Sequence, residues 1–110
     1  MIDWTDLGAV LDIPRQGART IDLDGRRIAV FRTLDDRIFA LDDRCPHKQG
    51  PLSQGIVHGH TVTCPLHNLR IALATGEAEG GDEGCTDTVA VRVAAGCILI
   101  ARSVPLTKAA

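Results

Sequence analysis

Apolar and polar residues alternate in short runs along most of this chain, and turn residues separate the runs. The run at 19–23 is followed by Asp24-Gly25, a pair typical of a two-residue hairpin turn. The chain returns in a second run at 27–32, and a third follows at 37–41. We therefore predict that three neighbouring antiparallel strands form the first half of the fold.

The second half continues the pattern with shorter runs, interrupted by Gly, Pro and other turn residues. Residues 5–12 are the one stretch in which the sequence permits a helical turn, and Pro14 would end it. Turn signals that recur about every 8–12 residues favour an all-β sandwich or barrel. The further strands are predicted at 56–58, 61–63, 71–73, 88–93 and 97–101.

Two irregular loops interrupt this pattern, at 43–55 and at 64–68. We expect a single domain over residues 1–110, with a small subdomain at about 43–74 carried on these loops. The base of the domain would comprise about 4–42 and 75–102. Segment 45–68 has few apolar residues, so the strands of the base are expected to supply most of the core.

Composition and charge exclude several classes of function. Lys and Arg number 12 against 14 Asp and Glu, so the basic surface of a nucleic-acid-binding protein is absent. No apolar run approaches the about 20 residues of a membrane helix, so we expect no membrane contact. The first residues, Met1 to Asp6, are acidic where a signal peptide would be basic, which predicts a cytoplasmic protein.

Two short motifs carry the candidate chemistry. Cys45-Pro46-His47 and Cys64-Pro65-Leu66-His67 are separated by the sixteen residues 48–63. Each motif offers one thiolate and one imidazole, and each lies in a loop rich in turn residues. Single cysteines and histidines usually have structural roles, but two such pairs in two loops predict one shared metal centre.

Two metal centres fit this donor set. Zinc would take Cys₂His₂ in a tetrahedron, although zinc fingers usually pair Cys with Cys and His with His. A 2Fe-2S cluster would take both cysteines on one iron and both histidines on the other. That arrangement needs one Cys and one His from each of two facing loops, which is the order found here.

The spacing Cys-x-His, sixteen residues, Cys-x-x-His resembles the signature of the Rieske iron–sulfur family, and the all-β pattern resembles the Rieske fold. The resemblance covers nearly the whole chain. It implies a 2Fe-2S cluster held by Cys45, His47, Cys64 and His67. A histidine-ligated cluster carries less negative charge than an all-cysteine one, so it accepts an electron at higher potential.

A closer resemblance lies outside the ligand motifs. The residues before Cys45 (39–44), the segment 73–78 and Asp82-Glu83-Gly84-Cys85 resemble the small subunit of assimilatory NAD(P)H-dependent nitrite reductase. This resemblance implies a partner: a large subunit with flavin, sirohaem and a 4Fe-4S cluster that reduces nitrite to ammonia. The chain has no GxGxxG after a strand, so it should not bind nicotinamide or reduce nitrite alone.

Two alternatives remain open from the sequence. One is a free Rieske ferredoxin that serves a ring-hydroxylating dioxygenase, and the other is a zinc-stabilised binding module. Four Cys or His residues are expected to have no part in ligation: Cys85, Cys97, His58 and His60. Around the ligands, Arg44, Lys48 and Arg70 either steer a partner or form a solvated face.

Overall fold

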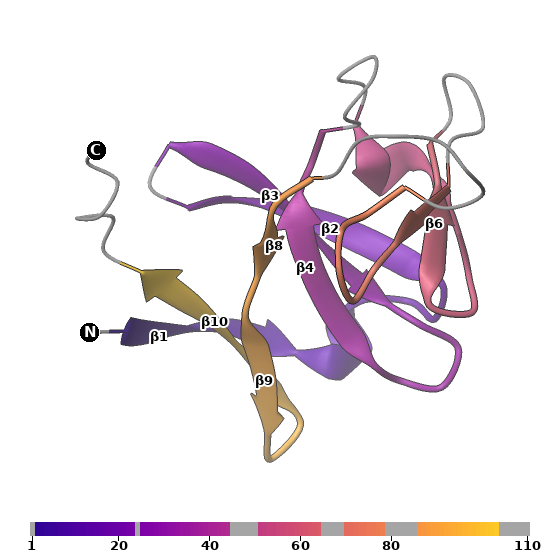
Figure 1. Cartoon of the computed structure of the whole chain (residues 1–110). Coiled ribbons are helices and arrows are strands. Elements are labelled where there is room, and N and C mark those ends of the chain that lie inside the picture. Colours follow the sequence, from indigo (N-terminus) through magenta and orange to yellow (C-terminus); the bar gives the residue numbers. More distant parts are fainter. Residues whose placement is uncertain (1, 24, 45–50, 65–69, 79–85, 104–110) are drawn as a thin grey trace.

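The computed structural model describes residues 2–23, 25–44, 51–64, 70–78 and 86–103, and this part of the chain is an all-β protein (Figure 1). The regular elements are ten strands and two single 3₁₀ turns. They are β1 (Ile2–Ala9), η1 (Val10–Asp12), β2 (Gly17–Leu23), β3 (Arg26–Arg32), β4 (Ile38–Asp42), η2 (Leu52–Gln54), β5 (Ile56–His58), β6 (Thr61–Thr63), β7 (Arg70–Ala72), β8 (Thr88–Val89), β9 (Val91–Ala94) and β10 (Cys97–Ser103).

The strands form three antiparallel sheets, in the orders β1-β10-β9, β2-β3-β4-β8 and β5-β6-β7. In Figure 1 the sheet β2-β3-β4-β8 lies in the middle, with β1 and β10 on one side and β6 on the other. Local hairpins build most of the pairs, whereas β1 pairs with β10 across almost the whole chain. In the described residues, no helix has the length and apolar character to cross a membrane.

The first hairpin confirms the turn predicted at Asp24-Gly25. Leu23 pairs with Arg26, which leaves a two-residue connection between β2 and β3. Gly25 has φ +86°, in the left-handed region that glycine enters without strain. The predicted strands at 56–58 and 61–63 are also confirmed, with the same bounds as β5 and β6.

The prediction for the N-terminal segment was wrong in part. Residues 5–9 continue β1 instead of forming a helical turn, and the only helical geometry there is the short η1. The register of β1 against β10 shifts between Asp6 and Gly8, so the strand contains a bulge. The bulge interrupts the alternation that a strand would otherwise show, which removed the sequence signal.

Two clusters of buried side chains hold the sheets together. The first, which we name cluster 1, lies between β5-β6-β7 and the strands β3 and β4. Cluster 1 consists of Ala29, Phe31, Leu41, Leu52, Val57, Val62, Cys64, Ile71 and Leu73. The second, cluster 2, lies under β10 and consists of Ile13, Leu23, Ile28, Val30, Ile38, Ala40, Ile98 and Ile100.

Most of the buried apolar residues that the structure describes belong to the base, as expected, and cluster 1 adds that segment 45–68 also contributes to the core. Leu52 and Val62 from that segment are fully buried, and so are Phe31 and Leu41 on the facing strands. The small sheet is therefore attached by a shared apolar core and not by its loops alone. The division into a subdomain at 43–74 and a base stays a prediction.

Candidate metal centre

Of the four predicted ligands, the structure describes Cys64. This residue follows β6 directly, is fully buried, and belongs to cluster 1. Cys45, His47 and His67 lie outside the described residues. The described residues contain no group of three or more His, Cys, Asp or Glu side chains placed to hold a metal ion.

The described residues that border the two ligand motifs meet at one end of β5-β6-β7. Thr63 pairs with Arg70 on one side and with Ile56 on the other. The segment that contains His67 therefore leaves and re-enters the sheet between paired strands. The turn η2 and then Gly55 lead into Ile56, the first residue of β5. The chain after Cys45 and His47 therefore enters the sheet at the end where Ile56 pairs with Thr63.

A buried carboxylate fixes the other boundary of the first ligand segment. Asp43 is 8% exposed, and its carboxylate accepts hydrogen bonds from the backbone N–H of Ser53 at 2.6 Å and from its hydroxyl at 2.8 Å. The backbone N–H of Asp43 donates to the carbonyl of Arg27 at 3.0 Å. These bonds tie the end of β4 to both η2 and β3, that is, to described residues on either side of the first ligand motif.

Close backbone packing supports the same end of the sheet. A Cβ atom placed on Gly55 would lie 2.2 Å from the carbonyl oxygen of Thr63. Only glycine lets the chain after η2 approach the end of β6 this closely. Gly76, with φ +77°, is as tightly confined, because a Cβ there would lie 2.1 Å from the carbonyl oxygen of Thr86.

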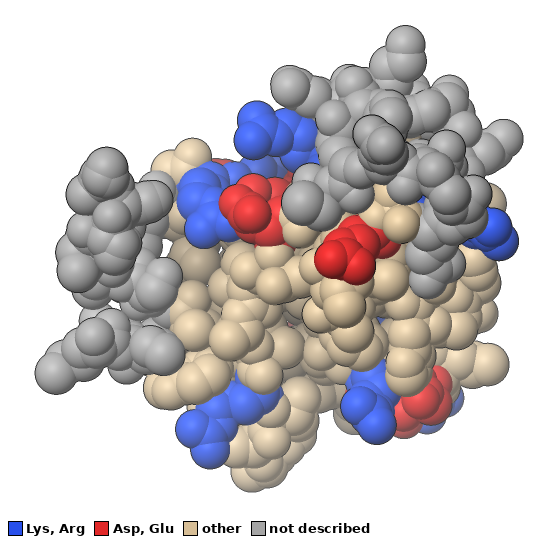
Figure 2. Space-filling view, in the orientation of Figure 1, with Lys and Arg blue, Asp and Glu red and all other residues tan. Residues whose placement is uncertain are grey.

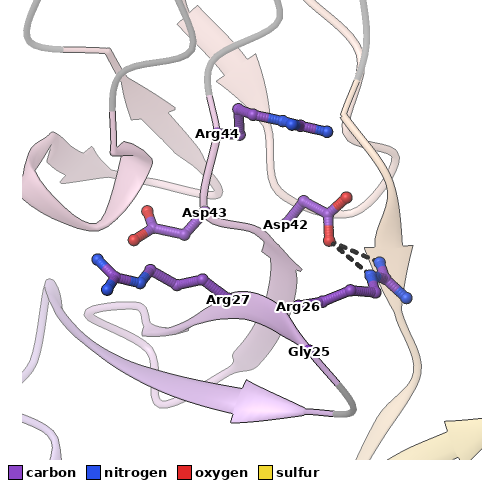
Figure 3. A pocket seen from close by; sticks show the side chains of 6 residues that line it. All are labelled: Gly25, Arg26, Arg27, Asp42, Asp43 and Arg44. Carbon is purple, nitrogen blue, oxygen red and sulfur yellow. Dashed lines mark hydrogen bonds and ion pairs between the residues drawn. The ribbon is translucent and has the colours of Figure 1, made fainter.

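A pocket of about 220 Å³ lies beside the start of the first ligand segment (Figure 3). Asp42 accepts hydrogen bonds from Arg26 at 2.6 and 3.2 Å, and Arg44 lies across the pocket from this pair. Three guanidinium groups against two carboxylates leave the pocket with a net positive charge. Its lining residues are Gly25, Arg26, Arg27, Asp42, Asp43 and Arg44.

Of the two other histidines, His58 is the last residue of β5 and His60 lies in the turn that follows, so they flank Gly59. His60 lies 3.1 Å from a carboxylate oxygen of Asp35 and packs against Phe39 at a ring-centroid distance of 5.4 Å. His58 contacts the hydroxyl of Thr63 at 2.7 Å. Both rings are exposed. His60 lies in the turn at the end of the sheet opposite to the Thr63–Arg70 pair, whereas the ring of His58 reaches back to Thr63, the residue directly before Cys64.

The turn between β3 and β4 is held by charged groups. The carboxylate of Asp36 accepts hydrogen bonds from Arg15 at 2.9 Å and from Arg32 at 2.7 Å, and these lower the pKa of Asp36 to about 2. The hydroxyl of Thr33 donates to Asp35, and this bond, followed by the contact with His60, lowers the pKa of that carboxyl. These ion pairs stabilise the scaffold and lie outside the metal centre.

The fold and the Cys/His pairs together define an iron–sulfur protein of the histidine-ligated class. A family model described as the Rieske 2Fe-2S domain matches residues 3–91. This chain belongs to the Rieske family, and its cofactor is a 2Fe-2S cluster. That assignment replaces the zinc alternative.

Dioxygenase ferredoxins and nitrite reductase small subunits are both among the proteins similar to this chain. The ferredoxin component of the naphthalene 1,2-dioxygenase and salicylate 5-hydroxylase systems from Ralstonia sp. is 32% identical over 76 residues, covering 69% of this chain and 72% of the relative. A proposed NADH-dependent nitrite reductase small subunit from Mycobacterium tuberculosis superposes with a TM-score of 0.85 at 25% identity, covering 94% and 98% of the two chains. The carbazole 1,9a-dioxygenase ferredoxin from Nocardioides aromaticivorans superposes with a TM-score of 0.82 at 23% identity. The superposition covers 91% of this chain and 98% of that ferredoxin.

The donor set fits the cluster that the family carries. Two thiolates and two imidazoles match the ligand requirement of a Rieske cluster. The described thiol, Cys64, is buried among apolar side chains, a setting that excludes water from a ligand. The chain is thus a Rieske electron-transfer component of an oxidoreductase system.

Sequence reasoning missed Asp43 as a structural residue of this site. Its position before Arg44 and Cys45 was interpreted only as part of an irregular loop. Its partner Ser53 is ten residues away, a separation that matches no local turn or capping pattern. An aspartate at the end of an apolar strand and two residues before Cys45 was the available signal.

Proposed function

We propose that this chain is the electron-transfer small subunit of an assimilatory NAD(P)H-dependent nitrite reductase and works in the cytoplasm. The observation that carries the proposal is the superposition on the proposed Mycobacterium tuberculosis small subunit, which covers 94% of this chain. The segment Asp82-Glu83-Gly84-Cys85 resembles the same family and supports it. The proposed partner is the large subunit with flavin, sirohaem and a 4Fe-4S cluster.

In this proposal Cys45 and Cys64 bind one iron, and His47 and His67 bind the other. The cluster, when bound, takes up and passes on one electron at a time. The Asp43–Ser53 bonds and the Thr63–Arg70 pairing hold the described residues that border the two ligand motifs. Cluster 1 keeps Cys64 out of water.

The basic pocket next to the first ligand segment would attract the partner. Arg44 is exposed, and Arg26 and Arg27 share its pocket, so an acidic surface on the large subunit would be drawn toward this end of the molecule. Arg70, exposed beside Thr63, adds a cation at the same end. Such charges mainly raise the association rate and the salt sensitivity of docking.

A second function is favoured by a specific observation. The dioxygenase ferredoxin component from Ralstonia sp. is 32% identical to this chain, which is higher than the 25% of the proposed nitrite reductase subunit. In that case the chain is a diffusing carrier that meets an oxygenase and a separate reductase in turn. The two functions differ in whether the chain stays with one large partner.

Isolation of the tagged holoprotein from its own cells at low ionic strength tests the proposal. We expect a stable complex with a large protein that contains sirohaem and flavin and reduces nitrite with NADH or NADPH. Deletion of the chain should abolish growth on nitrite as sole nitrogen source. Recovery of an oxygenase or a ferredoxin reductase, with normal growth on nitrite, would establish the dioxygenase alternative.

A further inference from the structure

The sheet β5-β6-β7 buries one face and exposes the other. Val57, Val62 and Ile71 pair in one row across the three strands and are buried in cluster 1. Side chains alternate along a strand, so the rows on either side of this one project from the opposite face, which we name the outer face. Because cluster 1 joins the inner face to β3 and β4, the outer face is turned away from the rest of the fold (Figure 1).

One row of the outer face borders both ligand motifs. Ile56 pairs with Thr63, and Thr63 pairs with Arg70. Thr63 directly precedes Cys64, and Arg70 is the third residue after His67. Directly opposed residues of antiparallel strands project to the same face, so an isoleucine, a threonine and an arginine lie side by side next to the two motifs.

Ile56 exposes a large apolar side chain at this position. The side chain is 70% exposed, although single exposed apolar residues are common on protein surfaces and its exposure alone indicates nothing. Its position distinguishes it. The other exposed large apolar residues in the described part of the chain lie in the sheet β1-β10-β9, in η1 and in the turn between β3 and β4: Trp4, Val93, Leu11 and Leu34.

The outer face carries a positive charge and, among the described residues, no negative one. Its outward side chains are those of Ile56, His58, Thr61, Thr63, Arg70 and Ala72. Arg70 is exposed, and no carboxylate of the described residues pairs with its guanidinium. Two copies of this face would not be complementary, because neither offers a carboxylate to Arg70. The complement of the face is an apolar surface that carries a carboxylate.

We propose that Ile56 and Arg70 contact the redox partner of this chain, and that the partner presents an apolar pocket with a carboxylate at its edge. Electrons pass rapidly between two proteins only when the two redox centres are close, so the partner must cover residues next to the cluster ligands. The row that contains Ile56 and Arg70 meets this condition, since it borders both ligand motifs. The proposal rests on the electron-transfer class of the chain and holds for either of the two functions above.

The residues of the row have different parts in this contact. Ile56 loses exposed apolar area on docking, so it should determine mainly how long the complex lasts. Arg70 pairs with a carboxylate at the rim, so it should determine mainly how fast the complex forms. The hydroxyl of Thr63 already contacts the ring of His58 at 2.7 Å and needs no group from the partner.

Electron exchange between the holoprotein and the large redox protein isolated with it tests the contact. Initial rates are measured at increasing concentrations of this chain. We expect Ile56→Ala to raise the apparent KM about tenfold with kcat unchanged, since it removes an interface contact and leaves the cluster intact. Leu34→Ala is the matched control and should behave like wild type. Leu34 is 62% exposed but lies in the turn whose Asp35 contacts His60, at the opposite end of the small sheet.

Ionic strength tests the charge. Arg70→Gln should raise the apparent KM about threefold or more at low salt, and this difference from wild type should shrink at high salt, where mobile ions screen the arginine. Arg37→Gln is the matched control, on an exposed arginine of the turn between β3 and β4. Ile56→Thr, which keeps a β-branched residue in β5, is a second test of the apolar contact and should also raise the KM.

A small neutral oxidant separates docking from damage to the cluster. Benzoquinone needs no docking surface, so it should oxidise the reduced Ile56 variants as fast as wild type, and their visible spectra should be unchanged. An unchanged KM in both Ile56 variants, an equal rise in KM for Leu34→Ala, or a benzoquinone rate that falls as much as the partner rate would each overturn the proposal. Isolation of an oxygenase instead of a sirohaem protein would refute the nitrite reductase function, and the same variants would still test the contact.

Discussion

Asp43 and Ser53 form a clasp across the base of the first ligand segment. The carboxylate of Asp43 accepts both the backbone N–H and the hydroxyl of Ser53, at 2.6 and 2.8 Å, although it is only 8% exposed. The clasp joins the residue after β4 to η2, and the chain between them contains Cys45 and His47. The two hydrogen bonds thus hold together described residues that stand before and after the first ligand motif.

Removal of the clasp should weaken both the fold and cluster retention. Asp43→Ala removes the acceptor of both hydrogen bonds from the half-buried Ser53, so we expect a loss of about 1–3 kcal/mol in the free energy of unfolding and faster bleaching of the cluster. Denaturant titration and the decay of visible absorbance in air measure the two effects. Ser53→Ala, which keeps the backbone bond, should show a smaller loss. Equal stability of Asp43→Ala and wild type would contradict this role.

Ligation by histidine predicts a sharp contrast among the four histidines. His47→Ala removes one of four ligands, so the purified variant should lack the visible spectrum and the electron paramagnetic resonance signal of a reduced Rieske cluster. His58→Ala and His60→Ala should keep both, because neither residue belongs to the two Cys/His motifs, and their rings contact Thr63 and Asp35 respectively. A full spectrum in His47→Ala protein would refute the ligand assignment.

Acid should weaken the turn between β3 and β4. The pKa of Asp36 is held at about 2, against an ordinary value of 3.8, mainly by the hydrogen bond from Arg15 and then by that from Arg32. A lowered pKa contributes stability at pH values above the ordinary one, and this stability is lost as the pH falls from about 4 to about 2. Urea titration at several pH values should show that loss in wild type.

Variants of the same ion pairs provide the controls. Asp36→Asn should be less stable than wild type at neutral pH and should lose less stability in acid. Arg15→Gln removes one of the two arginines that donate to Asp36, so its stability at neutral pH should lie between those of wild type and Asp36→Asn. Parallel stability curves for wild type and Asp36→Asn through this pH range would show that the carboxylate does not contribute.

Removal of iron should disorder the ligand segments but keep the sheets. Cluster 1 joins β5-β6-β7 to Phe31 and Leu41 through apolar packing, which needs no metal. Far-ultraviolet circular dichroism of the apoprotein should therefore keep most of its β signal. Ile71→Ala, at a fully buried position, should cost about 2–5 kcal/mol, and Ile56→Ala, 70% exposed in the same sheet, about 0.5 kcal/mol or less. Complete loss of β signal without iron would show a metal-dependent fold.

The fold was predictable wherever pairing is local. The alternation at 27–32 and 37–41 and the glycine at position 25 were sufficient to predict β3, β4 and the first hairpin. The pairing of β1 with β10 was not predictable, because its partners are far apart in sequence and the bulge after Asp6 breaks the alternation. Likewise, 88–93 was expected as one strand, but the chain changes sheets there and forms β8 and β9.

The ligands of the metal centre were predicted from the spacing of Cys and His residues. The contacts that hold the neighbouring backbone in place were not predicted. Two Cys/His pairs identify a cluster because few other structures need that combination, whereas the clasp of Asp43 with Ser53 depends on a contact that only the folded chain creates. The same holds for Gly55, whose close approach to Thr63 follows from the pairing of β5 with β6. Short-range patterns in the sequence reveal ligands, while tertiary contacts determine how firmly they are held.

The shared composition of cluster 1 limits how this protein can be engineered. Val62 and Ile71 share cluster 1 with Ala29 and Phe31 of β3 and Leu41 of β4, which do not belong to the small sheet. If residues 43–74 were transferred to another scaffold, the apolar side chains that β3 and β4 now cover would be exposed to solvent. We therefore expect such a protein to aggregate, even with every ligand present. A transferable form of this redox centre would have to include Phe31 and Leu41, or the recipient protein would have to provide equivalent apolar residues at their positions.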